Sequence, residues 1–126
     1  MRYLLVVSVL ACFATAASEA NYQGVLIDKA CSYKAETRIV PGPRLEGGIV
    51  VAYAHTRQCA LMPACQKSGY GVFTYDNKFL PFDEAGNQKA LALLKTTKKE
   101  DDLRVEVSGE YDAKNNVLKV AGIKLL

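Results

Sequence analysis

The residues best suited to chemistry lie in one eleven-residue segment, His55-Thr-Arg-Gln-Cys59-Ala-Leu-Met-Pro-Ala-Cys65. It contains the chain's single histidine and two of its four cysteines. An imidazole and thiolates are ligands for zinc and other soft metals, and two thiols can also join as a disulfide. Cys31 is a further thiol, 24 residues before His55. The segment therefore points to soft-metal capture or to thiol oxidation.

The spacing of these residues allows a metal site. His55 and Cys59 are four residues apart, so on a helix they would share a face and could bind one ion. Cys65, which follows a helix break at Pro63, and Cys31 would complete a Cys₃His set for zinc or copper. Because the segment contains no C-x-x-C pair, its spacing is not that of a standard zinc ribbon.

The N-terminal residues indicate the compartment. Residues 1–20 place Arg2 before an apolar run and then small residues, which is the anatomy of a signal peptide. We therefore expect an exported protein, periplasmic or secreted, with residues 21–126 as a single mature domain. Cys12 lies in a weak match to a lipoprotein acylation site, but the apolar run continues beyond it, which favours simple cleavage.

Export makes oxidation the first expectation for the three remaining thiols, Cys31, Cys59 and Cys65. Their odd number implies one disulfide with a spare thiol, an intermolecular disulfide, or shared ligation of a metal. Loop closure is worth about 2.4 kcal/mol for Cys59–Cys65 and about 3.5 kcal/mol for either pairing with Cys31. The sequence leaves the pairing open.

Thiol redox or nucleophilic catalysis is the third reading of the segment. His55 and Arg57 would favour a thiolate on a nearby cysteine. However, the sequence shows no C-x-x-C pair and no third group that would orient the imidazole. We therefore predict no catalytic residue, and a non-enzymatic protein is the expectation.

The elements that must position these residues are mainly strands. Alternating or β-branched runs predict strands over residues 22–28, 70–75, 78–82, 103–108 and 117–125. Helical patterns cover residues 49–58, 63–67 and 88–95, and residues 32–48 read as a loop. We expect a turn at Asp76-Asn77, a bulge or bend at Gly109, and inward-facing Leu103, Val105 and Val107.

This element order predicts a mostly β (α+β) fold. A helical Cys/His insertion between the first two of five strands, and a helix between the third and fourth, suit an OB-like barrel. Another small α+β sheet with the same elements is the alternative. Tyr70, Tyr75 and Phe79 are candidates for a ligand surface, because aromatic residues on such sheets can stack against ligands.

Charge and hydropathy narrow the partners. The net charge of +3 is mild and is spread along the chain, so we expect no nucleic-acid partner. The mature chain contains no apolar run long enough for a transmembrane segment.

Several motifs resemble a family of small, exported, largely uncharacterised bacterial proteins. They are His55-Thr-Arg-Gln-Cys59-Ala, Cys65, Ser68-Gly-Tyr-Gly-Val72, the segment Lys78 to Asp83, Gly86, and Val105-Glu-Val-Ser-Gly109. The resemblance implies a secreted, OB-like domain and transfers no activity and no catalytic residue.

Together these observations predict an exported binding or envelope-associated module of unknown ligand, with its insertion held by a disulfide. The alternative is a periplasmic zinc- or copper-binding protein that uses Cys31, His55, Cys59 and Cys65. A thiol redox protein is third.

Overall fold

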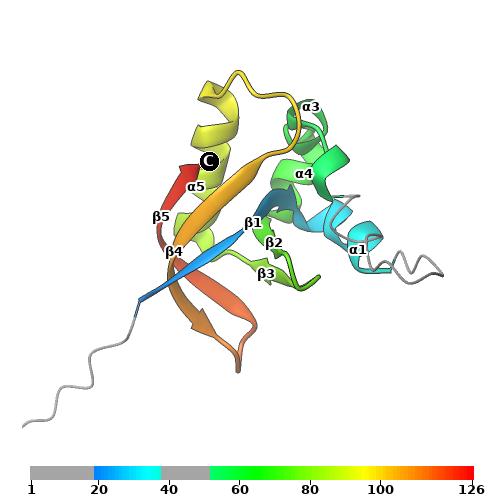
Figure 1. Ribbon diagram of the computed structural model, residues 1–126. Helices are drawn as coiled ribbons and strands as arrows, with labels where there is room; N and C mark the ends of the chain where they lie inside the picture. The colour runs from blue at the N-terminus through cyan, green and yellow to red at the C-terminus, as the bar shows by residue number, and fades with distance from the viewer. Residues whose placement is uncertain (1–18, 38–51) are drawn as a thin grey trace, which may run out of the picture.

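The computed structural model describes residues 19–37 and 52–126 (Figure 1). Its frame is a five-stranded antiparallel sheet in the order β3-β2-β1-β4-β5. The central strand is β1 (Ala20–Asp28), which lies between β2 (Tyr70–Thr74) and β4 (Arg104–Asp112). The outer strands are β3 (Phe79–Pro81) and β5 (Val117–Leu125).

This sheet confirms the mostly β class and the five strands. The helix predicted between the third and fourth strands is also present, as α5 (Glu84–Thr96). The sheet is not closed into a barrel. Beside its two outer strands, an isolated parallel bridge joins Phe82, which follows β3, to Leu118 of β5. We therefore describe an open sheet where a barrel was expected.

Two local predictions about the backbone are confirmed. The β2–β3 hairpin turns at Asp76-Asn77, where Asn77 has a φ of +62°, a conformation that asparagine tolerates. The register of β4 and β5 shifts between Ser108 and Gly109, which is the predicted irregularity at Gly109.

Apolar side chains cover both faces of the centre of β1. The main core lies on the face where α5 packs against β5 (Figure 1). It includes the inward-facing residues of β4 as predicted, and its members are Leu26, Ala60, Tyr70, Val72, Leu80, Phe82, Ala90, Leu94, Leu103, Val105, Val107, Leu118 and Val120. A smaller cluster on the other face contains Val25, Ile27, Ala52 and Phe73. The end of β1 therefore lies in the interior.

Short helices gather around this end of β1: α1 (Lys29–Thr37), α3 (Arg57–Ala60) and α4 (Pro63–Ser68) (Figure 1). Pro63 begins α4 and Gly69, with a φ of +84°, ends it, both as predicted.

Two predictions for this region are wrong. The helix expected over residues 49–58 is interrupted at residues 55–56, because Thr56 caps α3 and its Oγ1 accepts a hydrogen bond from the Cys59 amide at 3.1 Å. The loop expected over residues 32–48 is helical through Thr37, and its remainder lies outside the described residues.

The predicted leader also lies almost wholly outside the described residues, as does Cys12. Among the helices of the described ranges, none is long and apolar enough to cross a membrane.

Candidate metal-binding site

Asp28 is the buried carboxylate at the base of the site. It is the last residue of β1 and directly precedes α1, and its side chain is 0% exposed. Its Oδ2 accepts a hydrogen bond from the Cys31 amide at 3.0 Å, which is the interaction of a helix N-cap. This bond fixes the carboxylate and also fixes Cys31 in the first turn of α1.

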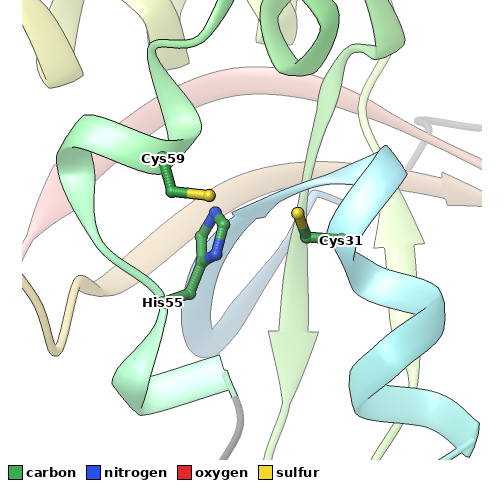
Figure 2. Close-up of side chains that lie close together, drawn as sticks. All are labelled: Cys31, His55 and Cys59. Atoms are coloured by element: carbon green, nitrogen blue, oxygen red, sulfur yellow. The ribbon is translucent and has the colours of Figure 1, made fainter.

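His55 and Cys59 approach from the other side of the site. His55 lies in the break before α3, where its amide donates to the Ala52 carbonyl at 3.2 Å. Cys59 lies on α3 itself. The two residues do not share one helix, yet Figure 2 shows their side chains together, with the Cys59 sulfur beside the ring nitrogen farthest from Cβ.

Three metal-binding atoms converge between these elements. One donor atom each from Cys31, His55 and Cys59 lie within 4.8 Å of one another, and we call this group the outer trio (Figure 2). Donor atoms of Asp28, Cys31 and Cys65 meet the same limit, and we call this group the inner trio. Cys31 belongs to both, while Asp28 and Cys65 are buried.

Backbone contacts hold the three helices in place around the trios. The Lys29 amide donates to the Gly69 carbonyl at 2.8 Å, and the Ala30 amide donates to Ser68 Oγ at 3.1 Å, so the start of α1 is tied to the end of α4. The Tyr70 hydroxyl donates to the Ala60 carbonyl at 2.7 Å, which anchors the end of α3 to β2.

Asp28 and His55 form the closest polar contact of the site. His55 Nε2 lies 2.6 Å from Asp28 Oδ1, and the two side chains are 8% and 0% exposed. The contact has the distance of an ion pair, and neither atom has a hydrogen-bond partner of ordinary geometry among the described residues. Buried polar atoms are seldom left in this condition. The contact is therefore a buried ion pair between two side chains that are both of metal-ligand type.

The pKa of the Asp28 carboxyl group and the pKa values of the neighbouring thiols shift in opposite directions. Burial favours protonated Asp28, but the adjacent His55 and the Cys31 amide outweigh burial, so the pKa of Asp28 lies below its ordinary value. Burial and the Asp28 charge raise the pKa of the Cys31 thiol to about 12, and the same causes raise the pKa of Cys65. A bound cation would reverse this effect, because thiols lose their protons when they coordinate a metal.

The structure places the site residues predicted from the sequence in two neighbouring groups. Cys31, His55 and Cys59 form one group, and Cys65 lies beside Cys31 but in the other group. All three cysteines are free thiols in the described part of the chain.

The aromatic residues proposed for a ligand surface differ widely in exposure. Tyr70 is 2% exposed and packs in the main core, so it supports α3 and is unavailable for stacking. Phe79 is half-buried and packs on the smaller cluster, whereas Tyr75 is 47% exposed.

Sequence reasoning missed Asp28. The signal that could have identified it is the spacing Asp28-x-x-Cys31 at the end of an apolar strand, because an aspartate at an N-cap places its carboxylate near the residue three positions later.

Comparison of the chain with protein-family models, with curated proteins and with solved structures finds no match.

Proposed function

We propose that the protein binds zinc, or another soft ion such as copper, through Cys31, His55 and Cys59. A tetrahedral zinc ion with nitrogen and sulfur ligands separates neighbouring ligand atoms by about 3.3–3.8 Å. The donor atoms of the outer trio lie within 4.8 Å of one another, so small side-chain movements would bring them to this separation. Thiolate and imidazole are also the ligand types that zinc and copper prefer over oxygen-binding cations.

Asp28 supplies the fourth donor in this proposal. The observation that carries it is the buried contact between Asp28 Oδ1 and His55 Nε2, where neither atom has a hydrogen-bond partner in the described chain. An ion bound by both atoms would replace this ion pair, and the two atoms would move from 2.6 Å to about 3.3 Å apart. The ion would then take over from His55 the compensation of the buried carboxylate charge.

The proposed role is a closed metal-binding module and not a metalloenzyme. Catalytic zinc sites keep a coordination position open for water or substrate, whereas structural sites are filled by protein ligands. With Asp28, the four positions are filled. Two of the four ligand side chains, Asp28 and His55, are less than a tenth exposed.

Export, the family resemblance and an OB-like barrel complete the proposal. The composition of residues 1–20 supports a periplasmic or secreted protein. The bridge between Phe82 and Leu118 supports a barrel-like closure, since it joins the two ends of the sheet.

Metal binding to the reduced protein tests this function. We expect one zinc ion per chain, measured by native mass spectrometry and by competition with a chromophoric chelator. Cobalt in its place is expected to give the absorption of a tetrahedral site with thiolate ligands. The matched variants are Cys59→Ser, which removes a ligand, and Cys65→Ser, which removes a thiol outside the proposed ligand set. Equal binding by wild type and Cys59→Ser would refute the proposed site.

A further inference from the structure

Cys31 is shared by two sets of neighbours. Its sulfur lies within 4.8 Å of the Cys59 sulfur in the outer trio and within 4.8 Å of the Cys65 sulfur in the inner trio. In the first set it is a proposed metal ligand. In the second it faces another thiol, and this thiol has no place in the proposed ligand set.

We propose that Cys31 and Cys65 form a disulfide in place of the metal, so that metal occupancy and oxidation exclude each other. This inference rests on the proposed function, because Cys31 must be one of the metal ligands. A sulfur engaged in a disulfide is not a thiolate and no longer holds a zinc ion.

The anchoring of the helices favours Cys65 over Cys59 as the partner. The bonds from Lys29 to Gly69 and from Ala30 to Ser68 already fix the start of α1 beside the end of α4. Ser68 Oγ also donates to the Cys65 carbonyl at 2.8 Å, which connects the Cys65 backbone to the same contact. A disulfide needs its two sulfurs at about 2.05 Å, and these hydrogen bonds hold the two backbones side by side while the side chains turn toward one another.

Cys59 is held by a different part of the molecule. Arg57, two residues earlier in α3, donates from Nε to the Leu94 carbonyl at 2.6 Å, and its amide donates to the Glu100 carbonyl at 2.7 Å. These bonds tie α3 to the end of α5 and to the chain that follows it. Movement of Cys59 toward Cys31 would work against them.

The oxidant required is a small-molecule or protein disulfide, RSSR. One protein thiolate attacks a sulfur of RSSR, which releases one RS⁻ and leaves a mixed disulfide on the protein. The second thiolate then attacks the protein sulfur of that mixed disulfide, which forms Cys31–Cys65 and releases the second RS⁻. The two thiol protons end on two molecules of RSH, so the zinc-free protein loses two electrons and two hydrogens.

The experiment exposes reduced protein to excess oxidised glutathione, with and without zinc. Without zinc we expect an intact mass lower by two hydrogens. At a free zinc concentration of 100 times Kd, about 1% of the protein is unliganded, so disulfide formation should be about 100-fold slower.

The sequence allows the pairing to be assigned. Trypsin cleaves after Lys29, Lys34, Arg57 and Lys67, and cyanogen bromide cleaves after Met62. The three cysteines then lie on separate peptides, residues 30–34, 58–62 and 63–67. We expect the disulfide to join peptides 30–34 and 63–67. If most of the linked product instead joined peptides 30–34 and 58–62, the assignment to Cys65 would be overturned.

Two matched variants separate this inference from the proposed function. Cys65→Ser should bind zinc within about threefold of wild type, since its ligands remain, but should form no internal disulfide with Cys31. Cys59→Ser should bind zinc poorly and oxidise at the same rate with or without zinc. Wild-type protein that binds zinc yet oxidises equally fast in its presence would overturn the exclusion alone, whereas protein that binds no zinc would overturn the proposed function.

Discussion

Asp28 and Asp83 are two aspartates in equivalent positions with different surroundings. Each directly precedes a helix, Asp28 as the last residue of β1 and Asp83 two residues after β3, and each accepts a hydrogen bond from the amide three residues later. The partners are Cys31 at 3.0 Å and Gly86 at 2.9 Å. Asp83 Oδ1 also accepts from the Val120 amide of β5 at 3.2 Å, whereas Asp28 Oδ1 faces the His55 ring.

The difference lies in what the fold places opposite the cap. At Asp83 the neighbour is the backbone of β5, so the carboxylate joins α5 to the sheet and its hydrogen-bonding capacity serves the fold. At Asp28 the neighbours are an imidazole and thiols, and one oxygen stays without a hydrogen-bond partner in the described chain. The same local feature, an aspartate at a helix N-cap, thus joins α5 to the sheet at Asp83 and forms part of the candidate metal site at Asp28.

Replacing Cys31 should have the largest effect, because it removes a proposed ligand. We expect Cys31→Ser to lower zinc affinity by more than about 100-fold. Loss of a residue that only orients a metal ligand already costs 10–100-fold, and Cys31 is a proposed ligand itself. Chelator competition on the reduced protein measures this change. Ser32→Ala is the neighbouring control. If both variants bound zinc with similar affinity, Cys31 would not be a ligand, and the Asp28 cap would be purely structural like the Asp83 cap.

The residue three positions after each aspartate gives a second contrast. A Cβ on Gly86 would lie 2.5 Å from Val120 Cγ2 and 2.7 Å from Phe82 Cβ, whereas the equivalent residue after Asp28 is Cys31. Gly86→Ala should therefore lower the free energy of unfolding by about 1–3 kcal/mol through overpacking. Urea denaturation checks this value. Unchanged stability would show that the packing between α5 and β5 at Gly86 has room for a methyl group.

Asp28→Asn tests the charge at the site while keeping the cap. Asparagine still accepts from the Cys31 amide, so the stability of the zinc-free helix cap is retained. Zinc affinity should fall 10–100-fold, because the anionic donor beside His55 is lost. Titration calorimetry gives the affinity, and an unchanged value would exclude Asp28 from the ligand set.

The smallest effect is expected for Asp83→Asn. Asparagine can keep the bond to the Gly86 amide, so the free energy of unfolding should change by less than about 0.5 kcal/mol and zinc affinity should not change. Thermal unfolding with and without zinc measures both. A loss of zinc affinity as large as that of Asp28→Asn would mean that the effect of Asp28 is not local.

Most of the sheet could be predicted from the sequence because its signals are local. Strict alternation placed Leu103, Val105 and Val107 inward, and the residues of the β2–β3 turn and of α4 have conformational preferences of their own. The break at residues 55–56 was missed because Thr56 ends one helical segment and caps the next through its side chain, and a hydrophobic pattern does not report this competition.

The candidate site was only half predictable for a related reason. Residue type identified Cys31, His55, Cys59 and Cys65, but their division into two trios depends on how α1, α3 and α4 pack. Asp28 reads locally as a helix cap like Asp83, and only the tertiary placement of His55 distinguishes it. Tyr70 was misjudged because alternation in β2 does not say which face is covered.

The bond from Arg57 to the Leu94 carbonyl extends the influence of the site to the far end of α5. Any change that tightens or releases α3 acts on the last turn of a helix that contributes nothing to the ligand set. Amide hydrogen exchange in that turn would then slow when the ion binds and quicken when it leaves. Hydrogen exchange at the C-terminal end of α5 would thus report whether the metal site is occupied, without any label on the thiols themselves.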